Sequence, residues 1–426
     1  MGPGGRLKIV HVSTYDVTGG AARAAYRLHR HLYGLGHDSS MLVLHRHSDD
    51  ATVTAFAPPG DVATRVRRRL RRWRIRRGFA RYQAKRPSGV EKFSDDRSAH
   101  GAAVCAQLPR CDVVNLHWVA GFIDYRDFFG SAPDKASLVW RLADMNPFTG
   151  GCHYDEHCRG FERRCGACPQ LGSHDARDLA RRIWDRKWAT LERVPRDRLN
   201  VVTPSRWLAG EAQRSPILGR FSITTIPNGV DVDSFAPRDR YLARDVLRIP
   251  RDARVLLFVA DALGNPRKGF PALAEAIEGL RKVEGLLLLS VGRGEPPREI
   301  GVPHLQLGHI TNDRLLSLVY SAADVCAIPS RHDNFPSAVL ESLACGTPVV
   351  GFAVGGIPEM VRTGATGWLV PPGDVAAFRD AIAQLLEDRA ARDEMAAECR
   401  RRAVEEYRLE TQAGRYVELY RRMCRR

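Results

Sequence analysis

Short apolar runs in the first half of the chain alternate with longer segments in which apolar residues recur at helical spacing. The runs predict strands at residues 8–13, 41–44, 112–116, 138–142 and 201–203. A helix is predicted to begin at the Gly19-Gly20 pair and to continue through Leu35. Because strands that alternate with helices pair in parallel, this half predicts a doubly wound α/β domain.

The second half of the chain repeats this alternation. Its apolar runs predict strands at residues 255–260, 286–291, 304–307, 325–328 and 349–352. Helices are predicted at residues 271–281, 312–321 and 411–425. The turn-forming sequence Pro227-Asn-Gly-Val-Asp231 separates the two series. We therefore predict two Rossmann-like domains that meet near this turn.

Composition adds limits on class and location. A chain of 426 residues with 44% hydrophobic content has room for two globular domains. No apolar run approaches the length that spans a bilayer. The N-terminal sequence enters a strand without the features of a signal peptide, so a cytoplasmic location is expected. In that compartment the ten cysteines are expected to be thiols or metal ligands rather than disulfides.

The net charge of +16 is concentrated in a basic segment at residues 64–86. Val66, Leu70 and Trp73 share one face of the predicted helix, and arginines cover the rest. Three interpretations are open: an interfacial helix on an anionic membrane, a nucleic-acid-binding stripe, or a solvated surface with no partner. We favour the membrane and expect no nucleic acid.

The most informative motif places two carboxylates, Asp333 and Glu341, eight positions apart at a loop-to-helix junction. A buried strand follows, and then Gly355-Gly356 opens a second helix near Pro358. Glu341 suits the two hydroxyls of a ribose, and Asp333 suits the hydroxyls of a sugar. The glycines and the helix N-terminus suit a phosphate. The pattern therefore predicts a nucleotide-sugar site; the alternative is a helix with a solvated carboxylate at each end. The candidate donor-binding residues in this stretch are Asp333, Asn334, Phe335, Pro336, Glu341, Gly355 and Gly356.

This stretch resembles the E-x7-E signature of the retaining glycosyltransferases of family 4, with Asp333 in place of the first glutamate. The sequences at 203–207, 226–231 and 366–374 resemble further passages of that family in order and spacing. The resemblance implies the GT-B architecture, in which two Rossmann-like doubly wound domains face a central cleft. It implies an acceptor-binding domain at 1–226, a nucleotide-sugar-binding domain at 227–408, and a final helix at 409–426 that crosses back to the first domain.

A lysine and an arginine follow the first predicted strand of the second domain. Parallel α/β sheets bind ligands at the carboxyl ends of their strands, so Lys268 is placed to neutralise a leaving diphosphate and Arg267 to add a planar fork. The family usually carries another arginine where this chain has Ala262. With these cations and a helix N-terminus, no cofactor is required for catalysis. The alternative is a surface Lys-Arg pair.

In the first domain, the amides of Gly19 and Gly20 are candidates to face the donor phosphates or the acceptor. The resemblance places His117 near the donor sugar and the site of transfer, with Lys268 and Asp333 as the other catalytic candidates. A histidine at a strand end is otherwise usually a packed residue. Asp144 is expected on the acceptor side; related enzymes carry a histidine where this chain has Ala143.

Four cysteines fall in a separate insert at 150–172. Their spacing allows a structural zinc site, reduced thiols or disulfides. A similar insert occurs in some bacterial exopolysaccharide glycosyltransferases, so the insert is expected to shape the acceptor side. The candidate metal ligands are Cys152, Cys158, Cys165 and Cys168.

Together these features predict a retaining, metal-independent hexosyltransferase. It would move a sugar from a UDP- or GDP-sugar to a glycan or lipid-linked glycan in polysaccharide biosynthesis, in the cytoplasm or peripherally on the inner face of the membrane. One alternative is a nucleotide-sugar epimerase or phosphorylase of the same architecture. Another is a non-catalytic nucleic-acid-binding or scaffold protein with a degenerate donor site. Ala143, Ala262 and Asp333 are the departures that leave these alternatives open.

Overall fold

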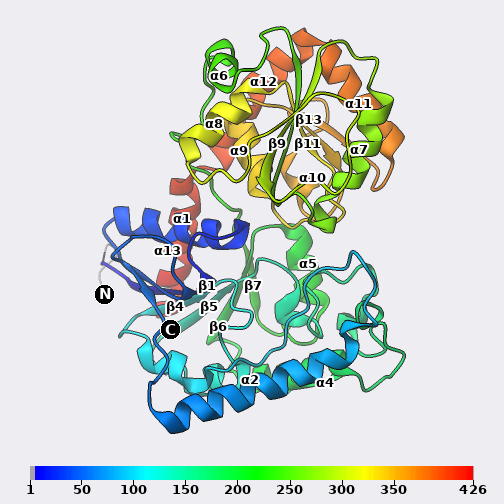
Figure 1. Ribbon diagram of the computed structural model, residues 1–426. Coiled ribbons are helices and arrows are strands. Elements are labelled where there is room, and N and C mark those ends of the chain that lie inside the picture. Colours follow the sequence, from blue (N-terminus) through cyan, green and yellow to red (C-terminus); the bar gives the residue numbers. More distant parts are fainter. Residues whose placement is uncertain (1–4, 426) are drawn as a thin grey trace. The chain divides into compact units, whose positions relative to one another are not determined.

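The computed structural model describes residues 5–425, and the chain divides into two compact units. The N-terminal unit comprises the chain up to Ile226 and a second segment that begins at Ala413. The C-terminal unit comprises Pro227–Gln412. Each unit holds one parallel sheet with helices around it (Figure 1).

The N-terminal unit is built on a seven-stranded sheet in the order β3-β2-β1-β4-β5-β6-β7, with every neighbouring pair parallel. Strands β2 and β3 follow β1 in turn toward one edge of the sheet. The next strand, β4, pairs with the other side of β1, so the direction in which strands are added reverses between β1 and β4. The strands are β1 (Lys8–Tyr15), β2 (Asp38–His45), β3 (Val53–Ala55), β4 (Val113–Leu116), β5 (Ser137–Arg141), β6 (Leu199–Thr203) and β7 (Ser222–Thr225).

Among residues 5–425, six α-helices belong wholly or mostly to this unit. They are α1 (Gly20–Gly34), α2 (Val62–Gln83), α3 (Tyr125–Ser131), α4 (Leu179–Leu191), α5 (Arg206–Arg214) and α13 (Leu409–Cys424). The last of them buries Tyr416 and Tyr420 in one apolar cluster with Ile9, Leu28 and Val113. The end of the chain is therefore part of the core of the N-terminal unit.

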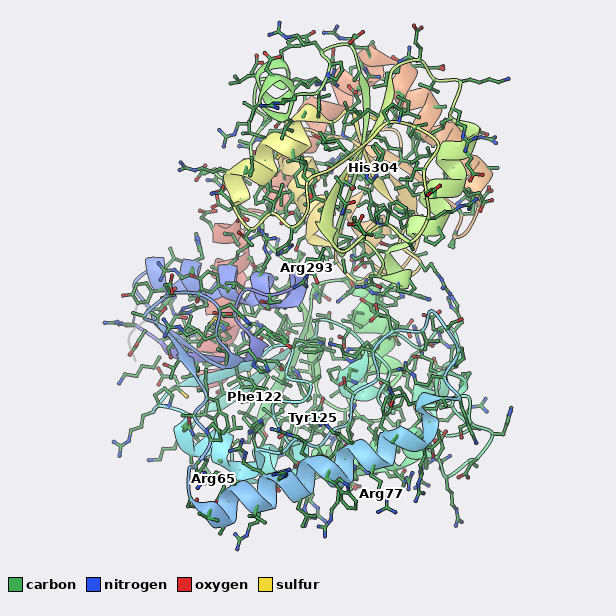
Figure 2. All side chains as sticks on the ribbon, viewed as in Figure 1. Arg65, Arg77, Phe122, Tyr125, Arg293 and His304 are labelled. Atoms are coloured by element: carbon green, nitrogen blue, oxygen red, sulfur yellow. The ribbon has the colours of Figure 1, made fainter. Side chains whose placement is uncertain are left out.

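Helix α2 differs from the others because none of its side chains is buried. It lies along the outside of the N-terminal unit, where Arg65 and Arg77 are exposed (Figures 1 and 2). The expected surface position of the basic segment is thus confirmed. Within residues 5–425, no helix combines the length and the apolar character that crossing a bilayer requires.

The C-terminal unit has a six-stranded parallel sheet in the order β10-β9-β8-β11-β12-β13, which reverses between β8 and β11. Its strands are β8 (Arg254–Ala262), β9 (Leu286–Arg293), β10 (His304–Gln306), β11 (Val325–Ile328), β12 (Val349–Phe352) and β13 (Gly367–Val370). Its α-helices are α6 (Arg240–Leu247), α7 (Phe270–Gly279), α8 (Asp313–Ala322), α9 (Ser337–Ala344), α10 (Ile357–Met360), α11 (Val375–Glu387) and α12 (Arg389–Glu406).

Both faces of this second sheet are covered. Val255 and Leu257 of β8 belong to one core cluster, whereas Leu256 and Phe258 belong to another on the opposite face. A strand that is buried on both faces is apolar at every position, which is why the sequence shows continuous runs rather than alternation. The expected α/β fold of two Rossmann-like units is confirmed.

Candidate functional site

The reversal of strand order between β8 and β11 creates the position where open α/β sheets bind ligands, beyond the carboxyl ends of the two strands. The chain that leaves β8 forms a short 3-10 turn, Pro266–Lys268, which carries both candidate cations. The chain that leaves β11 carries Asp333. The fold therefore brings together residues that are 65 positions apart in the sequence.

Asp333 accepts a hydrogen bond from Lys268 Nζ at 2.6 Å, and Arg267 Nη1 lies 3.2 Å from the same carboxylate oxygen. The side chain of Asp333 is only 9% exposed. Burial alone would raise the pKa of Asp333, but the charges of Lys268 and Arg267 outweigh burial and lower the pKa below its ordinary value. The cluster is thus an ionised carboxylate shared by two cations.

Backbone contacts hold this cluster in place. Arg267 Nη1 donates to the carbonyl of His332 at 2.9 Å, and the amide of Arg331 donates to the carbonyl of Arg267 at 2.8 Å. A Cβ on Gly355, whose φ is +56°, would lie 1.8 Å from the carbonyl oxygen of Asp333. Only glycine fits there, because of the close approach of the Asp333 loop as well as the backbone angle.

The neighbouring glycine also serves the loop. The amide of Gly356 donates to the carbonyl of Asp333 at 3.1 Å, so its hydrogen is directed at the protein. The helix that follows, α10, spans only Ile357–Met360. The expected second helix is therefore a single turn, and its contribution to phosphate binding stays a prediction.

Glu341 lies on α9 and is 4% exposed. The hydroxyl of Tyr320, on α8, donates to Glu341 Oε2 at 3.1 Å. Burial, and next the charge of Glu341, raise the pKa of Tyr320 well above its ordinary value, so this hydroxyl remains a donor. Tyr320 is a site residue that sequence reasoning missed, because it precedes Glu341 by 21 positions on another helix.

The residues between the two carboxylates are structural as well as candidate ligands. The amide of Asn334 donates to Asp333 Oδ1 at 3.1 Å. Phe335 is buried against Tyr407, with ring centroids 5.9 Å apart. Pro336 is the N-cap residue of α9. Their predicted contacts to a donor are not tested by these observations.

The N-terminal unit has the corresponding position at the reversal between β1 and β4. Gly19 follows β1 and caps α1 with φ of +84°, a conformation that favours glycine. A Cβ on either Gly19 or Gly20 would meet no other group within 4 Å. Packing therefore does not explain the pair, and its predicted role toward a ligand remains open.

His117 comes directly after β4 and is 1% exposed. Its Nε2 lies 2.9 Å from Nδ1 of His11, and the two rings stack with centroids 5.1 Å apart. Burial, and next the neighbouring histidine, hold the pKa of His117 well below its ordinary value. The imidazole is therefore neutral near pH 7, and a role at the sugar stays a prediction for an uncharged ring.

Asp144 lies three residues beyond β5, at the carboxyl edge of the sheet. Its Oδ2 accepts from Nδ1 of His153 at 2.6 Å and from Nε1 of Trp118 at 3.0 Å. His153 Nε2 in turn lies 2.9 Å from the hydroxyl of Ser94. Burial would raise the pKa of Asp144, and the contact with His153 reverses this and lowers it.

This Ser94–His153–Asp144 chain gives Asp144 an imidazole partner although Ala143 precedes it. Sequence reasoning placed Asp144 but missed Ser94 and Trp118. The available signal was His153, which lies in the stretch Thr149-Gly-Gly-Cys-His-Tyr154. The backbone of that stretch is held by Lys187 of α4, which is fully buried and donates to the carbonyl of Thr149 at 3.1 Å.

All four candidate metal ligands of the insert are free thiols; Cys152, Cys165 and Cys168 are buried, and Cys158 is exposed. Burial is the main cause that raises the pKa of each of them. Across residues 5–425, no three His, Cys, Asp or Glu side chains are grouped so that they could share a metal ion. Zinc in the insert stays a prediction.

Comparison with known proteins shows which class the C-terminal unit resembles. Residues 253–388, which span the site described in the C-terminal unit, match the family model for glycosyl transferases group 1. The resemblance to this class is confirmed, and with it the GT-B fold.

Two curated relatives are similar to part of this chain. D-inositol 3-phosphate glycosyltransferase of Mycobacterium leprae (strain Br4923) is 37% identical over 172 residues, which are 37% of this chain and 39% of the relative. The enzyme of the same name from Saccharomonospora viridis is 36% identical over 182 residues, which are 38% and 42% of the two chains. The chain thus matches only about two fifths of the length of these curated relatives.

Solved structures are similar over nearly the whole chain. Sucrose-phosphate synthase from Thermosynechococcus elongatus has a TM-score of 0.66 at 20% identity, covering 98% of this chain and 99% of that one. Anabaena Alr3699/HepE in complex with UDP-glucose has a TM-score of 0.64 at 15% identity, covering 97% and 99%. At these identities the similarity establishes the fold.

Proposed function

We propose that this protein is a retaining glycosyltransferase that moves a hexose from a nucleotide sugar to a glycan or lipid-linked glycan acceptor. The observation that carries the proposal is the cluster of Arg267, Lys268 and Asp333 at the strand reversal of the unit that matches the group 1 glycosyltransferases. Such a cluster supplies positive charge where a leaving diphosphate would develop negative charge.

The cations act by electrostatic stabilisation. When the bond between the sugar and the diphosphate breaks, negative charge collects on the phosphate oxygens, and fixed cations in a largely buried site stabilise that charge. Asp333 keeps Lys268 in place before the donor arrives, because its Oδ2 accepts a hydrogen bond from Lys268 Nζ. The other oxygen is available to accept hydroxyls of the donor sugar in addition to the amide of Asn334.

The donor is proposed to be a UDP- or GDP-sugar. Glu341 binds the ribose hydroxyls, and Tyr320 fixes the orientation of its carboxylate. The structure of Anabaena Alr3699/HepE with UDP-glucose, which shares the fold, supports a uridine nucleotide as the first donor to test. With two cations beside the diphosphate position, no divalent metal is assigned a step.

The acceptor is proposed to bind the N-terminal unit, near the Ser94–His153–Asp144 chain at the carboxyl edge of its sheet. Helix α2 supports a location at the inner face of the membrane, because Val66 and Trp73 are 61% and 52% exposed among arginines. An acceptor carried on a lipid would be presented at that surface. A role in polysaccharide biosynthesis follows from an acceptor of this kind.

The test is an acceptor-dependent transfer assay with UDP-glucose, GDP-mannose and lipid-linked or free oligosaccharides. The proposal predicts consumption of one donor only when an acceptor is present, with a glycosidic bond formed in the product. An epimerase would convert the donor without an acceptor, and a phosphorylase would require inorganic phosphate. A non-catalytic protein would consume no donor.

A further inference from the structure

The N-terminal unit contains a cavity of about 690 Å³ among α2, α3, α4 and the chain before β6. Six of its lining residues are arginines and three are aspartates, so positive charges outnumber negative ones by three. Burial is the first cause that raises the pKa of one of the aspartates, Asp96, to about 6, which makes the excess larger in mild acid. The charge of this cavity suits an anion.

Part of the arginine set is used to hold the fold. Arg71 of α2 pairs with Asp124 and Asp127 of α3, the latter at 2.8 Å, and so anchors the surface helix. Arg186 of α4 pairs with Asp96 and, at 3.0 Å, with Asp95. These arginines are not available to a ligand without loss of an internal contact.

Of the other four arginines, Arg97 pairs with Asp95 at 2.9 Å, and the remaining three keep unpaired donors. The side chains of Arg126 and Arg193 take part in no hydrogen bond or ion pair among the described residues. Arg198 donates through Nη2 to the carbonyl of Ala132 at 2.8 Å and lies 3.6 Å from the exposed carboxylate of Asp134, but its buried Nε has no partner. Guanidinium groups pair with phosphate through planar, two-pronged hydrogen bonds, so the three together favour a phosphate.

A second cavity of about 400 Å³ is adjacent to the first, since Arg71 and Arg97 line both. Its other lining residues all come from α2: Arg67, Arg74, Leu70 and Ile75. It therefore combines aliphatic side chains with cations and contains no acidic group. A ligand that fills both cavities would be a phosphate with a hydrocarbon chain attached.

We infer that these two adjacent cavities together bind the phosphate and the first part of the hydrocarbon chain of an anionic lipid. The head group lies among Arg126, Arg193 and Arg198, and the start of the hydrocarbon chain lies against Leu70 and Ile75. The exposed apolar residues on the outward side of α2 place the same helix at the bilayer from which such a lipid would come. The inference shares that placement with the proposed function, but lipid binding does not depend on sugar transfer.

Calorimetry with monomeric dihexanoyl phosphatidic acid tests the inference. The pocket variant carries Arg126→Gln with Arg193→Gln. The matched control carries Arg69→Gln with Arg76→Gln, which removes the same charge from exposed positions of α2 outside both cavities. The pocket variant is expected to bind the lipid about tenfold more weakly or worse, and the control within about twofold of the original chain, because only the pocket variant loses charge-assisted hydrogen bonds.

Three results would overturn the inference. Equal weakening in both variants would indicate a general attraction to α2. Inorganic phosphate that binds as tightly as the lipid would indicate a site for free phosphate. Displacement of the lipid by a short single-stranded RNA at equal concentration would indicate a nucleic-acid surface.

Two checks complete the test. Both variants should retain the unfolding midpoint and UDP binding, since neither touches the C-terminal unit. Should the double pocket variant unfold, Arg193→Gln alone is compared with Arg69→Gln, with the same criterion for weakening.

Discussion

The Nζ atom of Lys268 donates to Asp333 Oδ2 at 2.6 Å and so joins the chain beyond β8 to the chain beyond β11. Because the two strands are neighbours at the reversal of the sheet, this ion pair lies where a ligand of the C-terminal unit is expected. Both groups also belong to the proposed donor site. The pair therefore couples Lys268, the proposed cation for the diphosphate, to Asp333, the proposed carboxylate for the sugar.

This coupling is measurable as non-additivity. We predict that Lys268→Ala and Asp333→Asn each weaken binding of the intact UDP-sugar, and that the double variant loses less than the two losses added together. Residues in contact typically show coupling of about 0.5–3 kcal/mol. Calorimetry on the four proteins gives the coupling directly. Strictly additive losses would mean that the pair is not a functional unit in donor binding.

Glu341 is predicted to bind the nucleotide even without a sugar. Glu341→Gln keeps an oxygen to accept from Tyr320 but loses the charge-assisted bonds to ribose, so affinity for UDP should fall by about 10- to 100-fold. Tyr320→Phe is the control for loss of orientation alone, and its effect should be smaller. Unchanged affinity of Glu341→Gln for UDP, measured by calorimetry, would end the assignment.

The stacked pair of His11 and His117 predicts acid sensitivity in the N-terminal unit. Both pKa values are held well below 6.5 in the folded protein, first by burial. Below pH 6.5 the unfolded chain therefore binds more protons at these positions than the folded chain does, and stability falls as the pH falls. Above that pH both states are neutral here and the effect vanishes.

Urea unfolding between pH 7.5 and 5 measures this dependence. In His117→Asn the loss of stability on acidification should be smaller than in the original chain, because one of the two groups can no longer be protonated on unfolding. The variant will also be less stable at pH 7.5, since His11 loses its partner. An identical slope with pH in both proteins would contradict the account.

The exposed face of α2 is predicted to bind anionic vesicles. Val66→Ser with Trp73→Ser removes the apolar part of the contact and leaves every arginine in place, so binding should weaken and become more sensitive to salt. Leu242→Ser with Val246→Ser, on the exposed face of α6, is the matched control. Vesicle sedimentation at low salt is the measurement. Equal binding by both variants would leave α2 as a solvated surface.

The fold was largely predictable because parallel strands covered on both faces appear as apolar runs. Residues 325–328 and 349–352 are strands with the expected bounds. Among the strands that the apolar runs did not predict, Val53–Ala55 has only three residues, and Ser222–Thr225 is mostly polar at the sheet's edge. Such strands are defined by the pairing they make rather than by their own hydrophobicity.

The site was predictable by residue type but not by contact. Sequence spacing indicated Lys268 and Asp333 separately, but their pairing depends on the order of strands in the sheet. Ser94, His153 and Asp144 come from segments up to 59 positions apart, and only the folded chain joins them. The tight fit of Gly355 against the Asp333 loop likewise has no signal in sequence, where a glycine pair suggests a phosphate equally well.

The most direct test of the central claim is sugar transfer by the original chain and by Lys268→Ala, followed by NMR of the product's anomeric carbon. The account predicts acceptor-dependent transfer in which the anomeric configuration of the donor is retained. Turnover by Lys268→Ala should be lower by ~10²–10³, as for loss of a group that stabilises charge in the transition state. Transfer with inverted configuration, or near-normal turnover by Lys268→Ala, would contradict it.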